Sequence, residues 1–171
     1  MSLNLTSIHS RARVGKNVDI SPFVTVYEDV EIGDGCWIGP NVTIMNGARI
    51  GKNCRIFPGA VISGEPQDLK YKGEPTLAII GDNTTIRECV TVNKGTTANN
   101  QTIVGSNCLL MAYAHVAHDC VIGSNCVIAN NAALAAPASP MANVATGIPL
   151  GIWTMDSSES MPLSAFDCTG T

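Results

Sequence analysis

Aliphatic residues recur at every sixth position over most of the chain. The series begins at Ile8, is interrupted twice without a change of phase, and ends at Leu134. A helix repeats after about 3.6 residues and a strand after about two, so neither produces this spacing. A period of six is typical of a hexapeptide β-solenoid, in which each unit is a short strand followed by a turn. The series consists of Ile8, Val14, Ile20, Val26, Ile32, Ile38, Ile44, Ile50, Ile56, Ile62, Ile80, Ile86, Val92, Val104, Leu110, Val116, Ile122, Ile128 and Leu134.

A second, smaller residue follows each aliphatic position four places later, as at Ala12, Val18, Val24 and Cys36. We expect both side chains of a unit to point into the solenoid, with Gly, Asn and Asp in the turns. Three units make one triangular coil of about 18 residues, so the repeat predicts about seven coils. The predicted fold class is all-β, a parallel β-helix that forms one domain over residues 1–135.

Two polar stretches interrupt the repeat, residues 63–77 and residues 93–102. Both contain Gly and charged or amide side chains where inward aliphatic residues would otherwise stand. The aliphatic series resumes in phase after each, so we expect loops that leave the solenoid at a turn. Such loops can be plain surface insertions, but loops on a rigid scaffold are also where functional residues concentrate. We therefore favour a functional role.

Charge is distributed unevenly along the chain. The net charge is −4, which argues against a nucleic-acid-binding protein. All ten Lys and Arg residues lie between Arg11 and Lys94, so an anionic ligand would be held by this part of the chain, by backbone amides or by another molecule. The N-terminal residues do not resemble a signal peptide, and no apolar run has the length of a membrane span.

Five of the seven cysteines occupy the small inward position of the repeat, and no CxxC pair is present. There a cysteine acts as a compact hydrophobic residue, so we expect buried free thiols rather than disulfides or a metal site. Free thiols in turn favour a reducing, cytoplasmic location. The five are Cys36, Cys54, Cys108, Cys120 and Cys126.

The candidate chemistry lies in the segment 109–123. Val116 and Cys120 take the inward positions, which leaves His115, His118 and Asp119 outside the inward register. A histidine beside a carboxylate is a plausible general base, because its ordinary pKa of about 6.5 is close to neutral pH. The alternative is a solvated surface histidine. The only other histidine lies about six coils away, which excludes a three-histidine zinc site within one subunit.

Three motifs resemble those of a known family. They are GEPQDLKYKGEPT (64–76), TTIRECVTVNKGTT (84–97) and LLMAYAHVAHDCVIGSNCVIANNAALA (109–135). Over residues 3–135 the chain resembles the UDP-N-acetylglucosamine O-acyltransferases, cytoplasmic enzymes that open lipid A biosynthesis. The resemblance implies a left-handed β-helix and a homotrimer with active sites between subunits. It also implies transfer of a 3-hydroxyacyl chain from acyl carrier protein to the sugar 3-hydroxyl of UDP-N-acetylglucosamine, without metal or cofactor beyond the carrier thioester.

The resemblance also assigns roles to individual residues. His118 corresponds to the general base, and Asp119 to the carboxylate that orients it. Asp68, Lys70 and His115 correspond to substrate-binding residues. Asn93 stands where many relatives have histidine, and we leave it out of the predicted catalytic set.

The six-residue phase ends at Ala136, where the family continues with further coils and a C-terminal helical domain. Residues 136–171 contain four prolines and no Lys or Arg. We expect an aberrant tail, disordered or poorly packed, and a chain that is inactive on its own. Two other interpretations stay open at this point: another hexapeptide enzyme that uses coenzyme A or a zinc ion at a trimer interface, and a non-catalytic solenoid.

Overall fold

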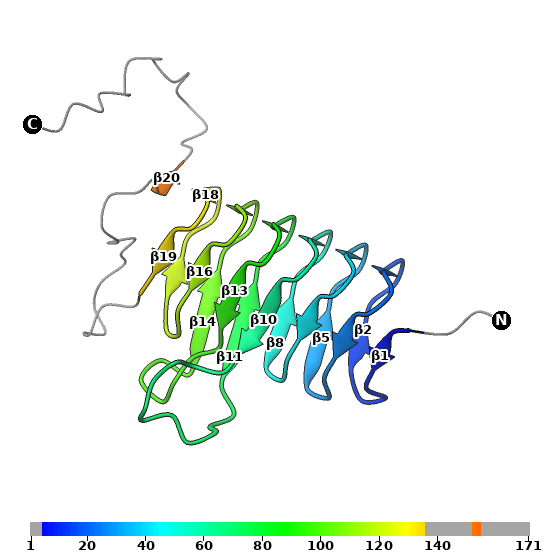
Figure 1. Cartoon of the computed structure of the whole chain (residues 1–171), viewed down its shortest axis with the longest axis horizontal. Helices are drawn as coiled ribbons and strands as arrows, with labels where there is room; N and C mark the ends of the chain where they lie inside the picture. Colours follow the sequence, from blue (N-terminus) through cyan, green and yellow to red (C-terminus); the bar gives the residue numbers. More distant parts are fainter. Residues whose placement is uncertain (1–4, 136–151, 155–171) are drawn as a thin grey trace, which may run out of the picture.

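The computed structural model describes residues 5–135 and 152–154 of the chain. The described residues form twenty short strands and no helix. Strands 1 to 19 follow one another around a three-sided prism, and each strand inside the stack pairs in parallel with the strand one coil earlier and the strand one coil later. Figure 1 shows the coils stacked along the long axis, with the chain advancing steadily from the N-terminal end. The predicted fold class, an all-β left-handed parallel β-helix of hexapeptide repeats, is confirmed.

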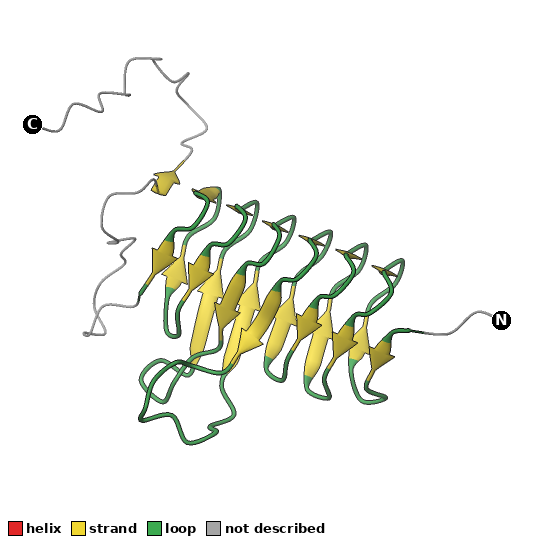
Figure 2. Ribbon diagram, viewed as in Figure 1, coloured by secondary structure: helices red, strands yellow, loops and turns green. Residues whose placement is uncertain are grey.

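Three parallel sheets form the sides of the prism (Figure 2). Sheet A contains β1 (Ser7–Ile8), β4 (Thr25–Val26), β7 (Thr43–Ile44), β10 (Val61–Gly64), β13 (Thr91–Asn93), β16 (His115–Val116) and β19 (Ala133–Leu134). Sheet B contains β2 (Arg13–Val14), β5 (Val30–Ile32), β8 (Ala48–Ile50), β11 (Leu77–Ile80), β14 (Gln101–Val104) and β17 (Val121–Ile122). Sheet C contains β3 (Asp19–Ile20), β6 (Trp37–Ile38), β9 (Arg55–Ile56), β12 (Thr85–Ile86), β15 (Leu109–Leu110), β18 (Cys126–Ile128) and β20 (Ile152–Thr154).

The core is the column of aliphatic and small residues that the period predicts. From Val24 to Leu134 both inward positions of nearly every unit are buried. The first coil differs: Ile8 is 44% exposed and Val14 is 38% exposed. The reason is geometric, because this coil has a described neighbour on one side only. Burial of each aliphatic side chain contributes about 1.5–3 kcal/mol, so stability accumulates coil by coil.

At one interior corner, a cysteine or threonine side chain of one coil donates a hydrogen bond to a glycine carbonyl of the next coil. The Sγ of Cys36 donates a hydrogen bond to the carbonyl of Gly51 at 3.1 Å, and the Sγ of Cys54 donates to that of Gly81 at 3.2 Å. In later coils Thr84 and Cys108 make the same contact with the next glycine. The five inward cysteines are buried free thiols, as predicted. Burial raises the pKa of the Cys120 thiol to about 11, which keeps it protonated.

The two predicted loops are present, although their neighbouring strands reach further than the sequence indicates. Strand β10 continues to Gly64 and β11 begins at Leu77, while β13 continues to Asn93 and β14 begins at Gln101. The extension has a physical cause, because Gly64 and Asn93 pair across adjacent coils. The loops therefore comprise residues 65–76 and 94–100.

Most of the predicted tail lies outside the described residues. Within it, Ile152–Thr154 form β20, which pairs antiparallel with β18 at the edge of sheet C. This strand is not a hexapeptide coil. The predicted domain boundary at residue 135 and the predicted disorder of the remaining tail residues stay predictions.

Candidate functional site at one corner of the prism

The candidate residues gather at a single corner, where sheet A passes into sheet B. Loop 65–76 joins β10 to β11, loop 94–100 joins β13 to β14, and residues 117–120 join β16 to β17. The strands before these three connections are stacked neighbours, since Ile62 pairs with Val92 and Val92 pairs with Val116. Successive coils are about 4.8 Å apart, so the two loops and the turn that carries His118 leave three consecutive coils at the same corner.

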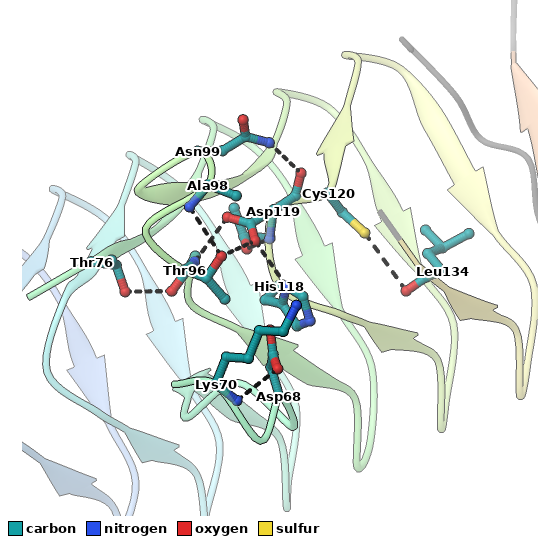
Figure 3. Close-up of polar contacts among 12 residues, drawn as sticks. Asp68, Lys70, Thr76, Thr96, Ala98, Asn99, His118, Asp119, Cys120 and Leu134 are labelled. Carbon is teal, nitrogen blue, oxygen red and sulfur yellow. Dashed lines mark hydrogen bonds and ion pairs between the residues drawn. The ribbon is translucent and has the colours of Figure 1, made fainter. Parts of the chain in front are cut away.

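His118 and Asp119 form a hydrogen-bonded pair in the turn after β16. The Nδ1 atom of His118 lies 2.8 Å from Oδ2 of Asp119 (Figure 3). An ionised carboxylate can only accept, so the Nδ1 atom carries the proton and the Nε2 atom of a neutral ring is left as the base. The side chain of Asp119 is 5% exposed and that of His118 is 29% exposed. The pair thus consists of a buried anion and an imidazole that solvent can reach.

Loop 94–100 and strand β14 supply the other partners of Asp119. The backbone N–H of Thr96 donates to Oδ1 at 2.8 Å, and the Thr96 hydroxyl donates to Oδ2 at 2.5 Å. The backbone N–H of Asp119 itself donates to the Thr102 hydroxyl at 2.8 Å. Burial acts to raise the pKa of the Asp119 carboxyl, but the hydrogen bonds from Thr96 and His118 outweigh it and lower the pKa below its ordinary value. Asp119 is therefore ionised at neutral pH.

His115 lies on β16 and faces out of sheet A. Its Nδ1 atom lies 2.7 Å from the hydroxyl oxygen of Thr91, one coil earlier. Burial lowers the pKa of His115, and the charge that His118 can carry lowers it further. His115 is therefore neutral at pH 7 and suited to hydrogen bonding rather than to charge pairing.

The two loops are fastened to each other. The Thr76 hydroxyl donates to the Gly95 carbonyl at 2.5 Å, and the Gly95 N–H donates to the Leu77 carbonyl at 3.0 Å. The side-chain amide of Asn93 donates to the Glu65 carbonyl at 2.9 Å. Figure 1 shows the loops side by side below the sheets. Whatever fixes one loop therefore also restrains the other.

Asp68 and Lys70 lie on the longer loop. The backbone N–H of Lys70 donates to Oδ1 of Asp68 at 2.9 Å, which forms a tight turn. This turn leaves the Lys70 side chain in solvent, and in the view of Figure 3 it extends toward the part of the corner that carries His118. Lys94, on the shorter loop, places its Nζ atom 5.4 Å from the centre of the Tyr71 ring. Lys70 and Lys94 thus place a positive charge on each loop, where an anionic ligand can be bound.

Sequence reasoning brought five residues to attention. The structure places four of them at this corner, Asp68, Lys70, His118 and Asp119, and the fifth, His115, on the adjoining strand β16. It missed Thr96 as the partner of Asp119, because no repeat position or charge marks a threonine in a polar loop.

Asn93 was also set aside, yet its side chain is buried and its Oδ1 atom has no hydrogen-bond partner. Among the described residues no group of three or more His, Cys, Asp and Glu could hold a metal ion. No helix in that part of the chain could cross a membrane.

Comparison with known proteins agrees with this picture. The family profile described as bacterial transferase hexapeptide (six repeats) matches residues 29–64 and 101–136. The acyl-[acyl-carrier-protein]–UDP-N-acetylglucosamine O-acyltransferase of Chlorobaculum parvum is 54% identical over 123 residues, which are 68% of this chain and 47% of that protein. The corresponding protein of Chlamydia caviae is 39% identical over 122 residues, covering 68% of this chain and 44% of its own.

Solved structures give the same result. The UDP-N-acetylglucosamine acyltransferase of Bacteroides fragilis is 51% identical, with a TM-score of 0.76 over 78% of this chain and 52% of that one. The enzyme of Acinetobacter baumannii is 38% identical, with a TM-score of 0.75 over 77% of this chain and 51% of that one. The chain spans about half the length of the relatives it matches. It belongs to the hexapeptide-repeat acyltransferase family that these UDP-N-acetylglucosamine O-acyltransferases represent.

Proposed function

We propose that the chain contributes to transfer of a 3-hydroxyacyl group from acyl carrier protein to the 3-hydroxyl of UDP-N-acetylglucosamine. The observation that carries the proposal is the His118–Asp119 pair, in which the buried carboxylate lies 2.8 Å from Nδ1 and so favours the neutral tautomer that leaves Nε2 free as a base. The names of the relatives supply the substrates, since they are called acyl-[acyl-carrier-protein]–UDP-N-acetylglucosamine O-acyltransferases.

The reaction needs a base because a sugar hydroxyl is a weak nucleophile. In the proposed step Nε2 of His118 takes the proton of the 3-hydroxyl while the oxygen attacks the thioester carbonyl. The new ester C–O bond forms, the C–S bond breaks, and the proton passes from His118 to the departing thiolate of the carrier. The ionised Asp119 stabilises the imidazolium that exists between these steps. A positioned base of this kind contributes about 10²–10⁴-fold to the rate.

The remaining residues suit substrate binding. Lys70 carries an exposed cation on loop 65–76, and the neutral His115 can donate or accept a hydrogen bond beside His118. We assign Asp68, Lys70 and His115 to the UDP-sugar. We also propose a homotrimer, because one prism surrounds the corner on one side only and a neighbouring copy would supply the other side. We propose a cytoplasmic location because the inward cysteines are free thiols.

The proposed chemistry uses no metal and no cofactor besides the carrier thioester. A hexapeptide enzyme that uses coenzyme A, a zinc site shared between subunits, and a non-catalytic solenoid are the alternatives. One assay of the purified chain separates these alternatives. It offers acyl carrier protein thioesters and coenzyme A thioesters separately, and it compares protein treated with a chelator with untreated protein.

The decisive variant is His118→Ala, measured for acyl transfer to UDP-N-acetylglucosamine. We expect a loss of at least about 10²-fold in rate with an unchanged melting temperature, because the side chain is on the outside of the prism. His9→Ala, in the first coil and far from the corner, is the matched control and should keep the parent rate. Near-parent transfer by His118→Ala would contradict the proposal, whereas a parent chain without transfer would agree with the inactivity expected of this chain on its own.

A further inference from the structure

Loop 94–100 and the start of β14 together contact the carboxylate, the carbonyl and the backbone N–H of Asp119. Thr96 donates to both carboxylate oxygens, and the Asn99 side-chain amide donates to the Asp119 carbonyl at 3.3 Å. On strand β14, just after the loop, the Thr102 hydroxyl accepts a hydrogen bond from the Asp119 N–H. Figure 3 shows Thr96 beside the Asp119 carboxylate, Asn99 above Asp119 and His118 below it. A turn residue with ordinary surface contacts would need none of them.

The physical need for such a grip follows from the burial of the charge. A buried carboxylate is costly unless its oxygens accept hydrogen bonds. The terminal torsion of an aspartate is also broad, so the carboxylate can rotate unless something opposes it. Here Oδ1 is held by the Thr96 N–H, and Oδ2 is shared between the Thr96 hydroxyl and Nδ1 of His118. The Thr96 hydroxyl therefore fixes the position from which Oδ2 accepts the His118 proton.

We propose that Thr96 is a positioning residue for His118, which acts through Asp119 to keep the imidazole proton on Nδ1 and the Nε2 atom free as the base. The positioning concerns only residues of this chain, whereas its use in acyl transfer rests on the proposed function. The clamp also extends to the longer loop. Gly95, next to Thr96, accepts the hydroxyl of Thr76, so the loop that carries Asp68 and Lys70 is held by the same segment as the base.

The first measurement is the tautomer of His118, read by ¹⁵N NMR of the histidine ring at a pH where the ring is neutral. The parent chain should show the proton on Nδ1. Thr96→Val, which removes the hydroxyl and keeps the backbone N–H, should shift the ring to a mixture of both tautomers. Thr96→Ser keeps the hydroxyl and should restore the parent spectrum. Thr97→Val is the matched control, because Thr97 is the exposed neighbour in the same loop and should change nothing.

Each outcome decides. A parent chain with the proton on Nε2 overturns the proposal without any variant, which covers the case in which Thr96→Val does not fold. A Thr96→Val spectrum identical to the parent overturns it as well, as does an equal effect of Thr97→Val. The expected set of spectra supports it.

The second measurement separates this proposal from the proposed function. Where the parent transfers acyl groups, Thr96→Val should lower kcat by about tenfold or more, with KM within about twofold, because the lost contact acts on the base and not on the substrate. If Thr96→Val shifts the tautomer and the parent chain shows no turnover, the positioning stands and the proposed reaction has no support from this chain. If kcat and the tautomer are both unchanged in Thr96→Val, the reaction stands and the positioning is overturned.

Discussion

At the scale of single residues, Asp119 combines two unfavourable conditions that its neighbours offset. Its backbone is left-handed, with φ of 61°, and its side chain is an almost fully buried anion. Most equivalent turn positions carry asparagine or glycine, as at Asn41 and Gly47, although Phe23, Cys89 and Tyr113 share the conformation. Aspartate tolerates this conformation, but burial of its charge is stable only because Thr96 and His118 donate to it. An asparagine there would fit the turn and lose the chemistry.

His115 makes the stability of the fold depend on pH. Its pKa is lowered in the folded state from the ordinary value of 6.5, so the unfolded chain takes up a proton first as the pH falls. The free energy of unfolding should therefore decrease below about pH 6.5. Asp119 does not act in this window. Its lowered pKa stabilises the fold at neutral pH, and that contribution is lost only as the pH falls through the ordinary carboxyl range and below it. Urea unfolding of the parent and of His115→Gln at about pH 7.5 and 5.5 tests this, and the variant should lose part of the slope. Equal slopes would show that His115 is not the titrating group.

At the scale of elements, the glycine that follows many aliphatic positions allows neighbouring coils to stack closely, because it has no Cβ atom. A Cβ atom on Gly81 would lie 2.5 Å from the backbone nitrogen of Ser106 in the next coil. Gly123 occupies the same corner in the last described turn of sheet B, and a Cβ there meets none of the described residues within 4 Å. The same sequence motif therefore has different constraints inside the stack and at its end.

This difference gives a matched pair of substitutions. Gly81→Ala should destabilise the fold by about 2 kcal/mol or more, because backbone atoms cannot move aside without separating two coils. Gly123→Ala should change stability by about 0.5 kcal/mol or less. Thermal or urea unfolding of both variants measures the difference. Similar costs at both positions would mean that the stacking distance does not explain the glycine.

The sequence predicts most of this architecture and less of the site. A six-residue period fixes which side chains point inward, so the burial of Ile38, Ile62 or Cys54 follows from counting alone. The period does not say which of the three corners a loop leaves from, because each insertion changes the count of residues per coil. That His118 shares a corner with both loops becomes visible only when Val92 is seen paired with Ile62 and Val116. The grip of Thr96 on Asp119 depends on that shared corner, and no local pattern encodes it.

At the scale of the whole molecule, the prism is a stack whose turns contact mainly their neighbours. The described contacts between strands join each coil to the one before and the one after. Such a body has flat sides and outer corners, and the candidate residues lie at one of these corners, where His118 and Lys70 are open to solvent. A ligand bound there would be covered by this chain on one side, and the proposed neighbouring copy would cover the other.

The proposed homotrimer gives this arrangement a testable consequence. A second copy placed against the corner would complete the site, and rotational symmetry would then create an equivalent site at every interface. We expect a mass of three chains by light scattering, unchanged in His118→Ala because that side chain carries the chemistry and not the fold. Specific activity should fall on dilution into the range where the mass falls, since a separated chain retains only one wall of the site. A monomeric mass with undiminished activity per chain would show that one prism binds and reacts unaided, and would locate the substrates entirely between its own two loops.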